Sequence, residues 1–387
     1  GTYPGISAQF SGAGFSGIMA AVHLRNARVS TFRHIDHAGD FGGVWYWNRY
    51  PGIQCDNDAC CYMPLLEETG YVPTRKFADG YDIQAHCRRI ATQYGLYDQA
   101  LFHTLIKSLR WDERISRWHV VTDRGDDIRA RFVIMCGGPL NRTKLPGIPG
   151  LAAIKGKVFH TAPWDYGYTG GGPDLPLTEL DDQVVGLIGT GASGIQCVPP
   201  LADAARHLFV FQRTPSAVGV RGNRPTEPAF GERLGPSWQR ERMDNFQALM
   251  LGRPVDVDLT DDGWKHHFAP VHHPPRRKGM SLEEYLRGAE ELDFGIMEEH
   301  RRRVEELVAD PATAEVLKPY YRYLCKRPCF HDEYLDAFNR PNVTLVDCPA
   351  GIEEVTARGP VVDGRQYEVD CLIYGTGFEG ELTPLYR

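Results

Sequence analysis

A glycine pattern that occurs twice constrains the fold of this chain more than any other feature. GAGFSG near the amino terminus and GTGASG in the middle both have the spacing G-x-G-x-x-G, each between a strand-like run (6–10 and 184–188) and a helical run. Such glycines permit a tight turn and bring a pyrophosphate close to the free N–H groups of the following helix. We therefore predict an α/β fold with two Rossmann-like dinucleotide-binding domains. Their cofactor turns comprise Gly12, Gly14, Phe15, Ser16 and Gly17 in the first copy, and Gly189, Thr190, Gly191, Ala192, Ser193 and Gly194 in the second.

The residues that end the next strand of each copy predict two different nucleotides. The run RVSTFRHID ends in Asp36, 22 positions after Gly14, where such folds place an acid on the adenosine ribose. An acid here favours a nucleotide with free ribose hydroxyls, which is NAD or FAD. The run HLFVFQRT ends instead in Arg213 and Thr214, and a guanidinium pairs with a ribose 2′-phosphate that a carboxylate would repel. The second site is therefore predicted to prefer NADP.

The duplication continues beyond the turns and sets the expected domain boundaries. Each half has a turn-centred hairpin followed by an apolar strand that ends in glycines, at 123–138 and 361–377. The second half is longer because of a segment with helical patterning at 281–292, which opens with a capping box at Ser281 and Glu284, and at 296–310. We predict an FAD-binding domain at 1–142, an NADP-binding domain at 143–215 and 317–380, and a helical insertion at 216–316 that forms a wall of the active-site cleft.

Composition narrows the class of partner. The 43 basic and 50 acidic residues give a net charge of −7, without the basic footprint expected for nucleic-acid binding. No apolar run approaches the ~20 residues of a membrane helix, and no signal-peptide pattern opens the chain. The ten cysteines are scattered without a C-x-x-C, so we expect mostly buried thiols in a soluble cytoplasmic protein. The histidine-rich segment 266–278 is predicted to be a mobile polar loop, and no metal site is assigned.

One FAD and one NADPH in the same chain imply hydride transfer from nicotinamide to flavin. A disulfide reductase would place a C-x-x-C or C-x4-C near the flavin, and the adjacent Cys60 and Cys61 do not offer that arrangement. Two longer motifs indicate what receives the electrons. The stretch IKGKVFHTAPWD is similar to the fingerprint F-x-G-x-x-x-H-x-x-x-W-[P/D] and departs from it at Ile154. The stretch GGVWYWNRYPGIQCD, residues 42–56, matches G-G-x-W-x-x-x-x-[F/Y]-P-G-x-x-x-D in full. The fingerprint positions are Gly156, His160, Trp164 and Asp165.

On these motifs the chain resembles the Baeyer-Villiger monooxygenases over nearly its whole length. The resemblance implies that NADPH reduces FAD, that O2 adds to give an anionic flavin peroxide, and that this attacks a ketone to give an ester or lactone. It places Arg327 of the CKRPCF segment at the developing anions, Lys326 on the NADP 2′-phosphate and Asp56 beside the arginine. Arginine suits this role because it stays protonated at all working pH values. The flavin contacts implied by the resemblance are Gly43, Val44, Trp45, Asp56 and Tyr62.

The resemblance also gives expectations for the domain crossing and the substrate. His160 and Trp164 are expected to lie in a connector and to fasten the two domains together, without touching the substrate. Members of the family continue beyond the GTGF strand with a segment that returns to the first domain. This sequence ends at Arg387, so we expect either a portion of a longer protein or a pocket that is built differently. The segments FQRTPSAVGVRGNRP and CKRPCFHDEY resemble members that act on bulky cyclic or steroid-like ketones.

Two alternatives remain open from the sequence. The N-/S-oxygenating flavin monooxygenases are relatives that lack the tryptophan and aspartate ending of the fingerprint. A non-catalytic protein that binds NADPH and flavin would also carry two dinucleotide motifs. The specific ketone, the position of oxygen insertion and the oligomeric state are not determined by the sequence.

Overall fold

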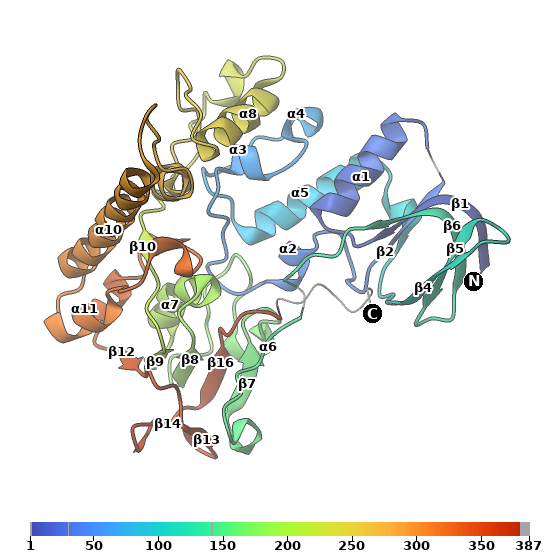
Figure 1. Ribbon diagram of the computed structural model, residues 1–387. Coiled ribbons are helices and arrows are strands. Elements are labelled where there is room, and N and C mark those ends of the chain that lie inside the picture. Colours follow the sequence, from blue (N-terminus) through green and yellow to red (C-terminus); the bar gives the residue numbers. More distant parts are fainter. Residues whose placement is uncertain (1, 30, 141, 380–387) are drawn as a thin grey trace.

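The computed structural model describes residues 2–29, 31–140 and 142–379. Figure 1 shows two sheets side by side, with the inserted helices at the top and left of the view. We call the part that carries the first sheet the first domain, the part that carries the second sheet the second domain, and residues 216–316 the insertion. The predicted α/β class with two Rossmann-like units is confirmed.

The first sheet has six strands in the order β3-β2-β1-β6-β5-β4. Its strands are β1 (Thr2–Ser11), β2 (Phe32–Ile35), β3 (Ala100–Leu101), β4 (Ile106–Asp112), β5 (Arg117–Thr122) and β6 (Asp127–Met135). Strands β1, β2, β3 and β6 are parallel, and β4 and β5 extend the sheet as an antiparallel hairpin. The longer helices α1 and α5 lie together against the sheet in Figure 1. The helices of this domain are α1 (Phe15–Asn26), α2 (Val44–Trp47), α3 (Ala59–Tyr62), α4 (Leu66–Thr69) and α5 (Gly80–Gln93).

The second sheet is entirely parallel, in the order β12-β9-β8-β16-β7. Its central run β9-β8-β16 repeats the order β2-β1-β6 of the first sheet, which confirms the internal duplication. Beside it lies a small antiparallel sheet of β13, β14 and β15. The elements are β7 (Lys157–His160), α6 (Tyr166–Thr169), β8 (Val184–Ile188), α7 (Ala192–Ala204), β9 (His207–Gln212), β12 (Val343–Asp347), β13 (Glu354–Thr356), β14 (Gly359–Val362), β15 (Arg365–Gln366) and β16 (Cys371–Tyr374).

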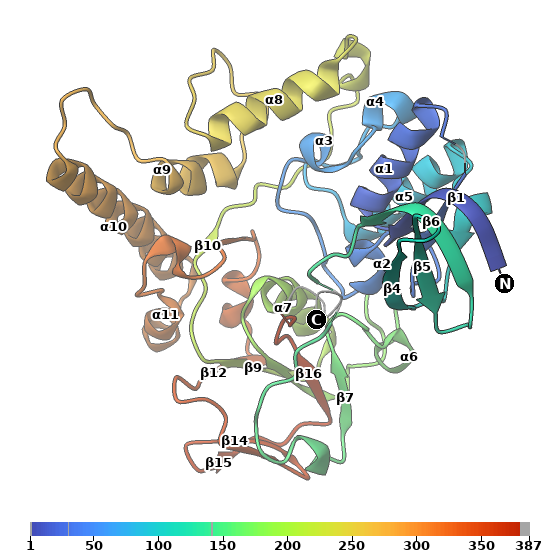
Figure 2. The ribbon, with the colours of Figure 1, turned by 45° about the vertical axis from the view of Figure 1, so that its right-hand side comes forward.

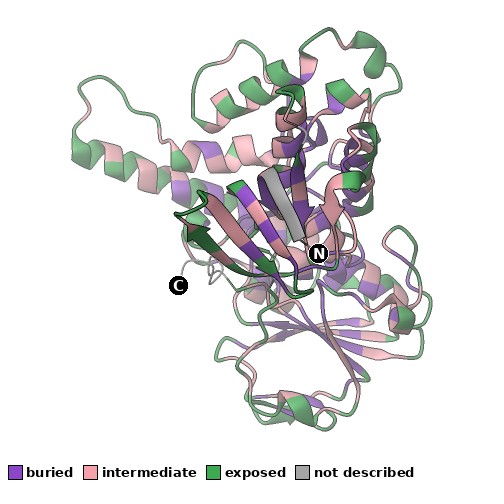
Figure 3. Ribbon diagram, turned by 90° about the vertical axis from the view of Figure 1, so that its right-hand side faces the viewer, coloured by how far each residue is buried: buried purple, intermediate pink, exposed green. Residues whose placement is uncertain are grey.

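Residues 216–316 contain several helices, whose bounds differ from the expected ones. Most of the segments 281–292 and 296–310 forms one continuous helix, Leu282–Leu307, which runs through the buried Asp293 between them; the Asp293 carboxylate accepts a hydrogen bond from the Tyr323 amide at 3.0 Å. The predicted capping box at Ser281 and Glu284 is present. Figure 3 shows burial confined to the inner half of this helix. The helices are α8 (Trp238–Met250), a π-helical turn (Trp264–Phe268), α9 (Ala269–His272), α10 (Leu282–Leu307) and α11 (Pro311–Leu317).

The prediction of a mobile loop over residues 266–278 is wrong for its first half. Residues 264–272 form helical turns because aromatic side chains anchor them. Trp264 packs against Phe330 with ring centroids 5.4 Å apart, and His267 lies 5.0 Å from the buried ring of His300. The histidines and prolines of this segment predicted a polar loop. The rings that hold it in helical turns, Phe330 and His300, come from segments distant in the sequence.

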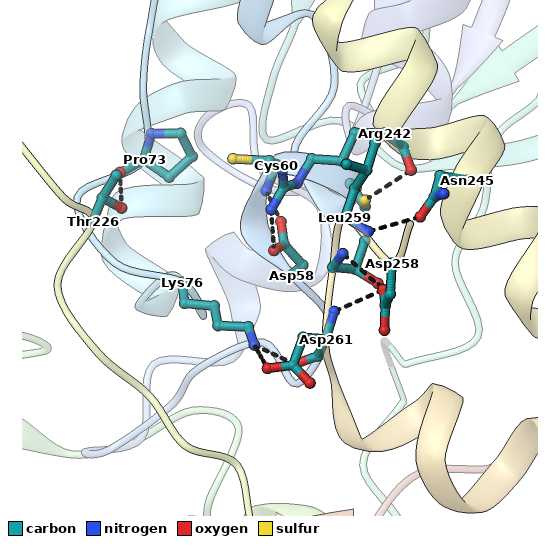
Figure 4. A network of polar contacts seen from close by, with 12 residues as sticks. Asp58, Cys60, Pro73, Lys76, Thr226, Arg242, Asn245, Asp258, Leu259 and Asp261 are labelled. Atoms are coloured by element: carbon teal, nitrogen blue, oxygen red, sulfur yellow. Dashed lines mark hydrogen bonds and ion pairs between the residues drawn. The ribbon is translucent and has the colours of Figure 1, made fainter. Parts of the chain in front are cut away.

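The insertion contacts the first domain although it interrupts the second. Figure 2 shows α8 beside α3 and α4, while α10 and α11 lie on the side of the second sheet. Figure 4 shows the polar contacts of this interface. The Arg242 guanidinium pairs with Asp58 at 3.2 Å, and the Thr226 hydroxyl donates to the Pro73 carbonyl at 2.6 Å. Lys76 pairs with Asp261 at 3.8 Å. The insertion is therefore fastened to the first domain at several points.

The interface also holds a buried carboxylate that makes stability depend on pH. Burial, with a smaller contribution from the nearby charge of Asp58, raises the pKa of Asp262 from 3.8 to about 6. The folded state therefore binds this proton more tightly than the unfolded state, and stability falls as the pH rises from about 4 to about 6. We expect Asp262→Asn to stabilise the protein by ~3 kcal/mol at pH 7.5 and by almost nothing at pH 4. Thermal unfolding at the two pH values tests this, with exposed Asp256→Asn as the control; equal gains at both would contradict it.

The remaining short elements complete the description. Strand β10 (Val218–Gly219) pairs in parallel with β11 (Cys329–Phe330), which joins the start of the insertion to the CKRPCF segment. Seven of the ten cysteines are buried and all are unpaired, which confirms the expectation of mostly buried thiols. Among the described residues, none of the helices has the length and apolar character needed to cross a membrane.

Candidate active site

The first glycine turn opens into an elongated pocket. Gly12 has a φ of +120°, and a Cβ there would lie 2.5 Å from the Cys136 carbonyl oxygen, so only glycine fits. Helix α1 begins at Phe15 without a side-chain cap, which leaves its first N–H groups free for a ligand. The Asp36 carboxylate accepts hydrogen bonds from the Ala13 amide at 2.7 Å and the Ala38 amide at 2.8 Å. The acid predicted for the ribose is thereby fixed beside the turn.

The charge of Asp36 is maintained by its hydrogen bonds. Burial opposes ionisation, but bonds from His37 and from the amides of Ala38 and Ala13 outweigh it and lower the pKa of this carboxyl. Asp36 therefore remains an acceptor for hydroxyl groups at neutral pH. The adjacent His37 stacks on Trp47 with ring centroids 4.5 Å apart, which places an aromatic wall beside the carboxylate.

The pocket has a volume of about 820 Å³, which suits a large organic cofactor. Its glycine floor, the free amides of α1 and the acid fit a flavin-adenine dinucleotide. Gly17 packs under the turn, and Asp56 and Tyr62 lie outside the lining; the Tyr62 hydroxyl accepts from Trp45 Nε1 at 3.0 Å. The predicted flavin contacts that line the pocket are Gly12, Gly14, Phe15, Ser16, Asp36, Gly43, Val44 and Trp45.

Part of the lining was not identified from the sequence. These residues are Ser11, Ile35, His37, Gly42, Trp47, Thr104, Leu105, Ile106, Lys107, Met135, Cys136, Gly137, Gly138, Pro139, Leu140 and Arg142. Met135 ends β6 and those from 136 onward follow it, and β6 lies directly beside β1 in the sheet. The carboxyl ends of parallel strands form the ligand edge of such sheets. The closing glycines of the apolar strand were therefore the available signal, but the strand order was needed to place them.

The second glycine turn repeats the first and leaves an open position. Gly189 has a φ of +108°, and a Cβ there would lie 2.5 Å from the Gly375 carbonyl oxygen. At Gly191, by contrast, a Cβ would meet no described atom within 4 Å. The packing of the chain therefore does not require glycine at 191, whereas close approach of a pyrophosphate does. Helix α7 also begins without a side-chain cap, so its first amides are free to meet that ligand.

Two cations lie together at the carboxyl end of β9. Arg213 is exposed there, and Lys326 Nζ donates to the carbonyl oxygens of Thr214 at 2.9 Å and Pro215 at 3.1 Å. Burial lowers the pKa of Lys326, and the charge of Arg213 lowers it further. An anion between the two side chains would relieve their repulsion. The pair fits the 2′-phosphate that distinguishes NADP from NAD.

Arg327 and Asp56 form an ion pair that crosses between the two domains. The two residues are 271 positions apart, yet Arg327 Nη2 lies 2.8 Å from Asp56 Oδ2. Asp56 is 13% exposed, whereas Arg327 is 51% exposed and faces the Trp264 ring at 5.4 Å. Burial lowers the pKa of Arg327, but the charge of Asp56 more than offsets this, so the net shift is upward. The site therefore presents an oriented cation that stays charged.

The fingerprint begins at an edge of the second sheet, which corrects the prediction that His160 lies in a connector: Gly156 directly precedes β7, and Trp164 and Asp165 follow that strand. His160 ends β7, the edge strand of that sheet. Its Nδ1 accepts from the Ala162 amide at 3.1 Å, so Nε2 carries the proton and donates to the Gly377 carbonyl at 3.0 Å. Burial lowers the pKa of His160, which favours this neutral form. Trp164 Nε1 donates to the Thr169 hydroxyl at 3.0 Å.

The contacts of this motif with the first domain come from its neighbours. The Arg49 amide donates to the Ala162 carbonyl at 3.4 Å, and the Tyr166 hydroxyl donates to the Arg49 carbonyl at 2.5 Å. Gly156 allows β7 and β16 to meet, because a Cβ there would lie 2.4 Å from the Asp370 carbonyl oxygen. Asp165 accepts from the Tyr168 amide and pairs with Lys157 at 2.5 Å. His160 and Trp164 thus shape the loop that touches the first domain.

Comparison with known proteins gives consistent matches. The family described as NAD(P)-binding Rossmann-like domain matches residues 12–69. Pentalenolactone D synthase from Streptomyces arenae is 52% identical over 380 residues, which cover 97% of this chain and 64% of that protein. Baeyer-Villiger monooxygenase 4 from Dietzia sp. (strain D5) is 50% identical over 378 residues, which cover 95% of this chain and 61% of that protein.

The fold also matches solved structures. Polycyclic ketone monooxygenase from the thermophilic fungus Thermothelomyces thermophila superposes with a TM-score of 0.91 at 40% identity, covering 97% of this chain and 63% of that one. This chain therefore spans less than two thirds of the length of each of these three proteins.

Proposed function

The chain belongs to the Baeyer-Villiger monooxygenase family, and on that premise we propose that the protein is an FAD- and NADPH-dependent ketone monooxygenase. A ketone, O2, NADPH and a proton are converted to an ester or lactone, NADP⁺ and water. The observation that carries the proposal is the Arg327–Asp56 ion pair of 2.8 Å. It joins the domain with the FAD-type pocket to the domain with the NADP-type turn, where the reaction would bring both cofactors together.

The roles of the residues follow from their contacts. The bound cofactors supply hydride transfer and activation of O2. The glycine turns hold their pyrophosphates, Asp36 accepts from a ribose hydroxyl, and Arg213 and Lys326 bind the 2′-phosphate. Asp56 orients Arg327, whose guanidinium stabilises negative charge that develops on the substrate oxygen. Arginine suits this task because it remains protonated throughout the reaction.

We propose a bulky cyclic or steroid-like ketone as the substrate class. The support is the similarity to polycyclic ketone monooxygenase and to pentalenolactone D synthase, together with the FQRTPSAVGVRGNRP and CKRPCFHDEY segments. We also place the enzyme in the cytoplasm, since its ten unpaired cysteines suit a reducing compartment.

The colour of the purified full-length protein tests the cofactor assignment. We expect a yellow preparation that NADPH bleaches and that air restores. A preparation that stays colourless after incubation with FAD would contradict the flavin assignment. A yellow protein that NADPH does not bleach would favour a non-catalytic binding protein.

His160→Ala tests the role of the loop that touches the first domain. Without the bonds of His160 to Ala162 and Gly377, the loop loses its fixed shape and the nicotinamide is held less well against the flavin. We expect flavin reduction to slow by about 2- to 10-fold, as for loss of a hydrogen bond of ~1 kcal/mol, and hydrogen peroxide to leak. Flavin content should not change. Stopped-flow absorbance and a peroxide assay measure both effects; unchanged coupling of NADPH use to product would contradict this role.

A further inference from the structure

Arg221 contacts both chain segments that carry the Arg327–Asp56 pair. Its Nη1 donates to Gln54 Oε1 at 2.5 Å, and Gln54 lies two residues before Asp56. Its Nε donates to the Phe330 carbonyl at 3.0 Å, and Phe330 lies three residues after Arg327. We propose that Arg221 is a positioning residue that holds the two partners of the ion pair in register across the domain interface. The importance of that pair for oxygenation rests on the proposed function.

Arg221 is itself held rigidly, as a positioning residue must be. It is 6% exposed. The Asp332 carboxylate accepts hydrogen bonds from the backbone amides of Arg221 and Gly222 at 2.9 Å and of Asn223 at 3.1 Å. The parallel pairing of β10 with β11 fixes the preceding residues against Cys329 and Phe330. The backbone of Arg221 is therefore fastened to β11, the strand that begins two residues after Arg327.

The partner on the other side is equally fixed. Gln54 Nε2 donates to Asp79 Oδ1 at 2.6 Å, and the Gln54 carbonyl accepts from Gln196 Nε2 at 3.0 Å. Gln196 belongs to α7, the helix that follows the second glycine turn, and its Oε1 accepts from the Tyr50 hydroxyl at 2.9 Å. Arg221 thus joins the insertion to the first domain at a residue that also contacts the helix of the NADP turn.

The charges around Arg221 support the same role. Burial lowers its pKa, and among the charges that raise it Asp56 has the largest effect, followed by Cys55 and Asp332. The charges of Asp332, Arg221, Asp56 and Arg327 therefore alternate in sign across the interface. Asp56 is therefore stabilised by two arginines, one in direct contact and exposed, the other buried.

Arg221→Met and Arg221→Lys in the full-length flavoprotein test the proposal by turnover. We expect the rate of flavin reduction in Arg221→Met to stay within about threefold of the parent rate. The amount of oxygenated product formed per NADPH consumed should fall by about 10- to 100-fold, as for loss of two hydrogen bonds to positioned groups. Arg221→Lys keeps the charge and should recover part of this coupling. Arg242→Met is the matched control, since Arg242 pairs with Asp58 at the same interface without contacting Gln54 or Phe330. Unchanged coupling in Arg221→Met would overturn the proposal.

Thermal unfolding gives a readout that does not need turnover. Arg221→Met should lower the Tm of the parent by at least twice as much as it lowers the Tm of Asp56→Asn. The reason is that the Asp56→Asn variant no longer has the Asp56 charge that Arg221 stabilises in the parent. Equal shifts in both backgrounds would overturn the proposal, and Arg221→Lys serves for the same comparison if Arg221→Met does not fold. If the parent forms no oxygenated product from any ketone but the shifts are unequal, the proposed function fails and the role of Arg221 as a bridge stands.

Discussion

Replacing Arg327 with alanine is expected to leave reduction of the flavin by NADPH within a few-fold of the parent and to lower oxygenation by ~10²–10³, the usual effect of losing a preorganised donor to a developing anion. The reason is that the guanidinium is held by Asp56 at 2.8 Å and remains half exposed, so it is oriented yet accessible. Reduction depends instead on the two nucleotide sites, which do not contain this side chain. Stopped-flow absorbance measures the first rate and quantified product the second.

The neighbouring Arg322 provides the control for that variant. It is exposed and pairs with Glu290 on the surface of the insertion. Arg322→Ala should therefore leave both rates unchanged. Normal product formation in Arg327→Ala would remove Arg327 from the proposed role, and a loss of flavin reduction as large as the loss of oxygenation would indicate a structural defect.

Removing both Arg213 and Lys326 is expected to abolish the preference for NADPH. Each charge-assisted hydrogen bond contributes about 1.5–3 kcal/mol, so the double alanine variant should lose ~10²-fold or more in kcat/KM for NADPH. NADH lacks the 2′-phosphate, so its kcat/KM should change little. Steady-state oxidation of the two nucleotides measures the ratio directly.

The matched control for this variant flanks the same strand at its other end. Arg206 directly precedes β9, whereas Arg213 directly follows it, so Arg206→Ala removes a cation at the far end of the strand. That variant should retain the selectivity of the parent. An equal loss of kcat/KM with both nucleotides in the double variant would contradict the assignment of these cations to the 2′-phosphate.

The parts of the fold that were predictable are those specified by local patterns. The predicted strand 184–188 coincides with β8, and the predicted strand 6–10 lies within β1. Both glycine turns precede helices, and Asp36 follows β2 as expected. These features depend on residues within one strand–turn–helix unit, where hydrophobic periodicity and glycine geometry act over short distances.

The parts that were missed depend on contacts between distant segments. Strand β7 is only four residues long, and its first three residues are all half-buried. Its sequence, KVFH, therefore does not show the alternation of buried and exposed positions that marks a strand. The helical turns at 264–272 are ordered by Phe330 and His300. Arg221 lies within the FQRTPSAVGVRGNRP segment, but that resemblance gave it no role, and the role proposed for it follows only from its contacts with Gln54 and Phe330. Sequence patterns do not report pairings of this kind.

Oxygen transfer from isotopically labelled O2 tests the central proposal most directly. The full-length protein with FAD and NADPH is incubated with bulky cyclic ketones, and the products are analysed by mass spectrometry. The proposal predicts a lactone that carries one labelled oxygen atom, together with consumption of one NADPH for each lactone. Formation of sulfoxides or N-oxides from added thioethers or amines, with no labelled lactone from any ketone, would contradict it.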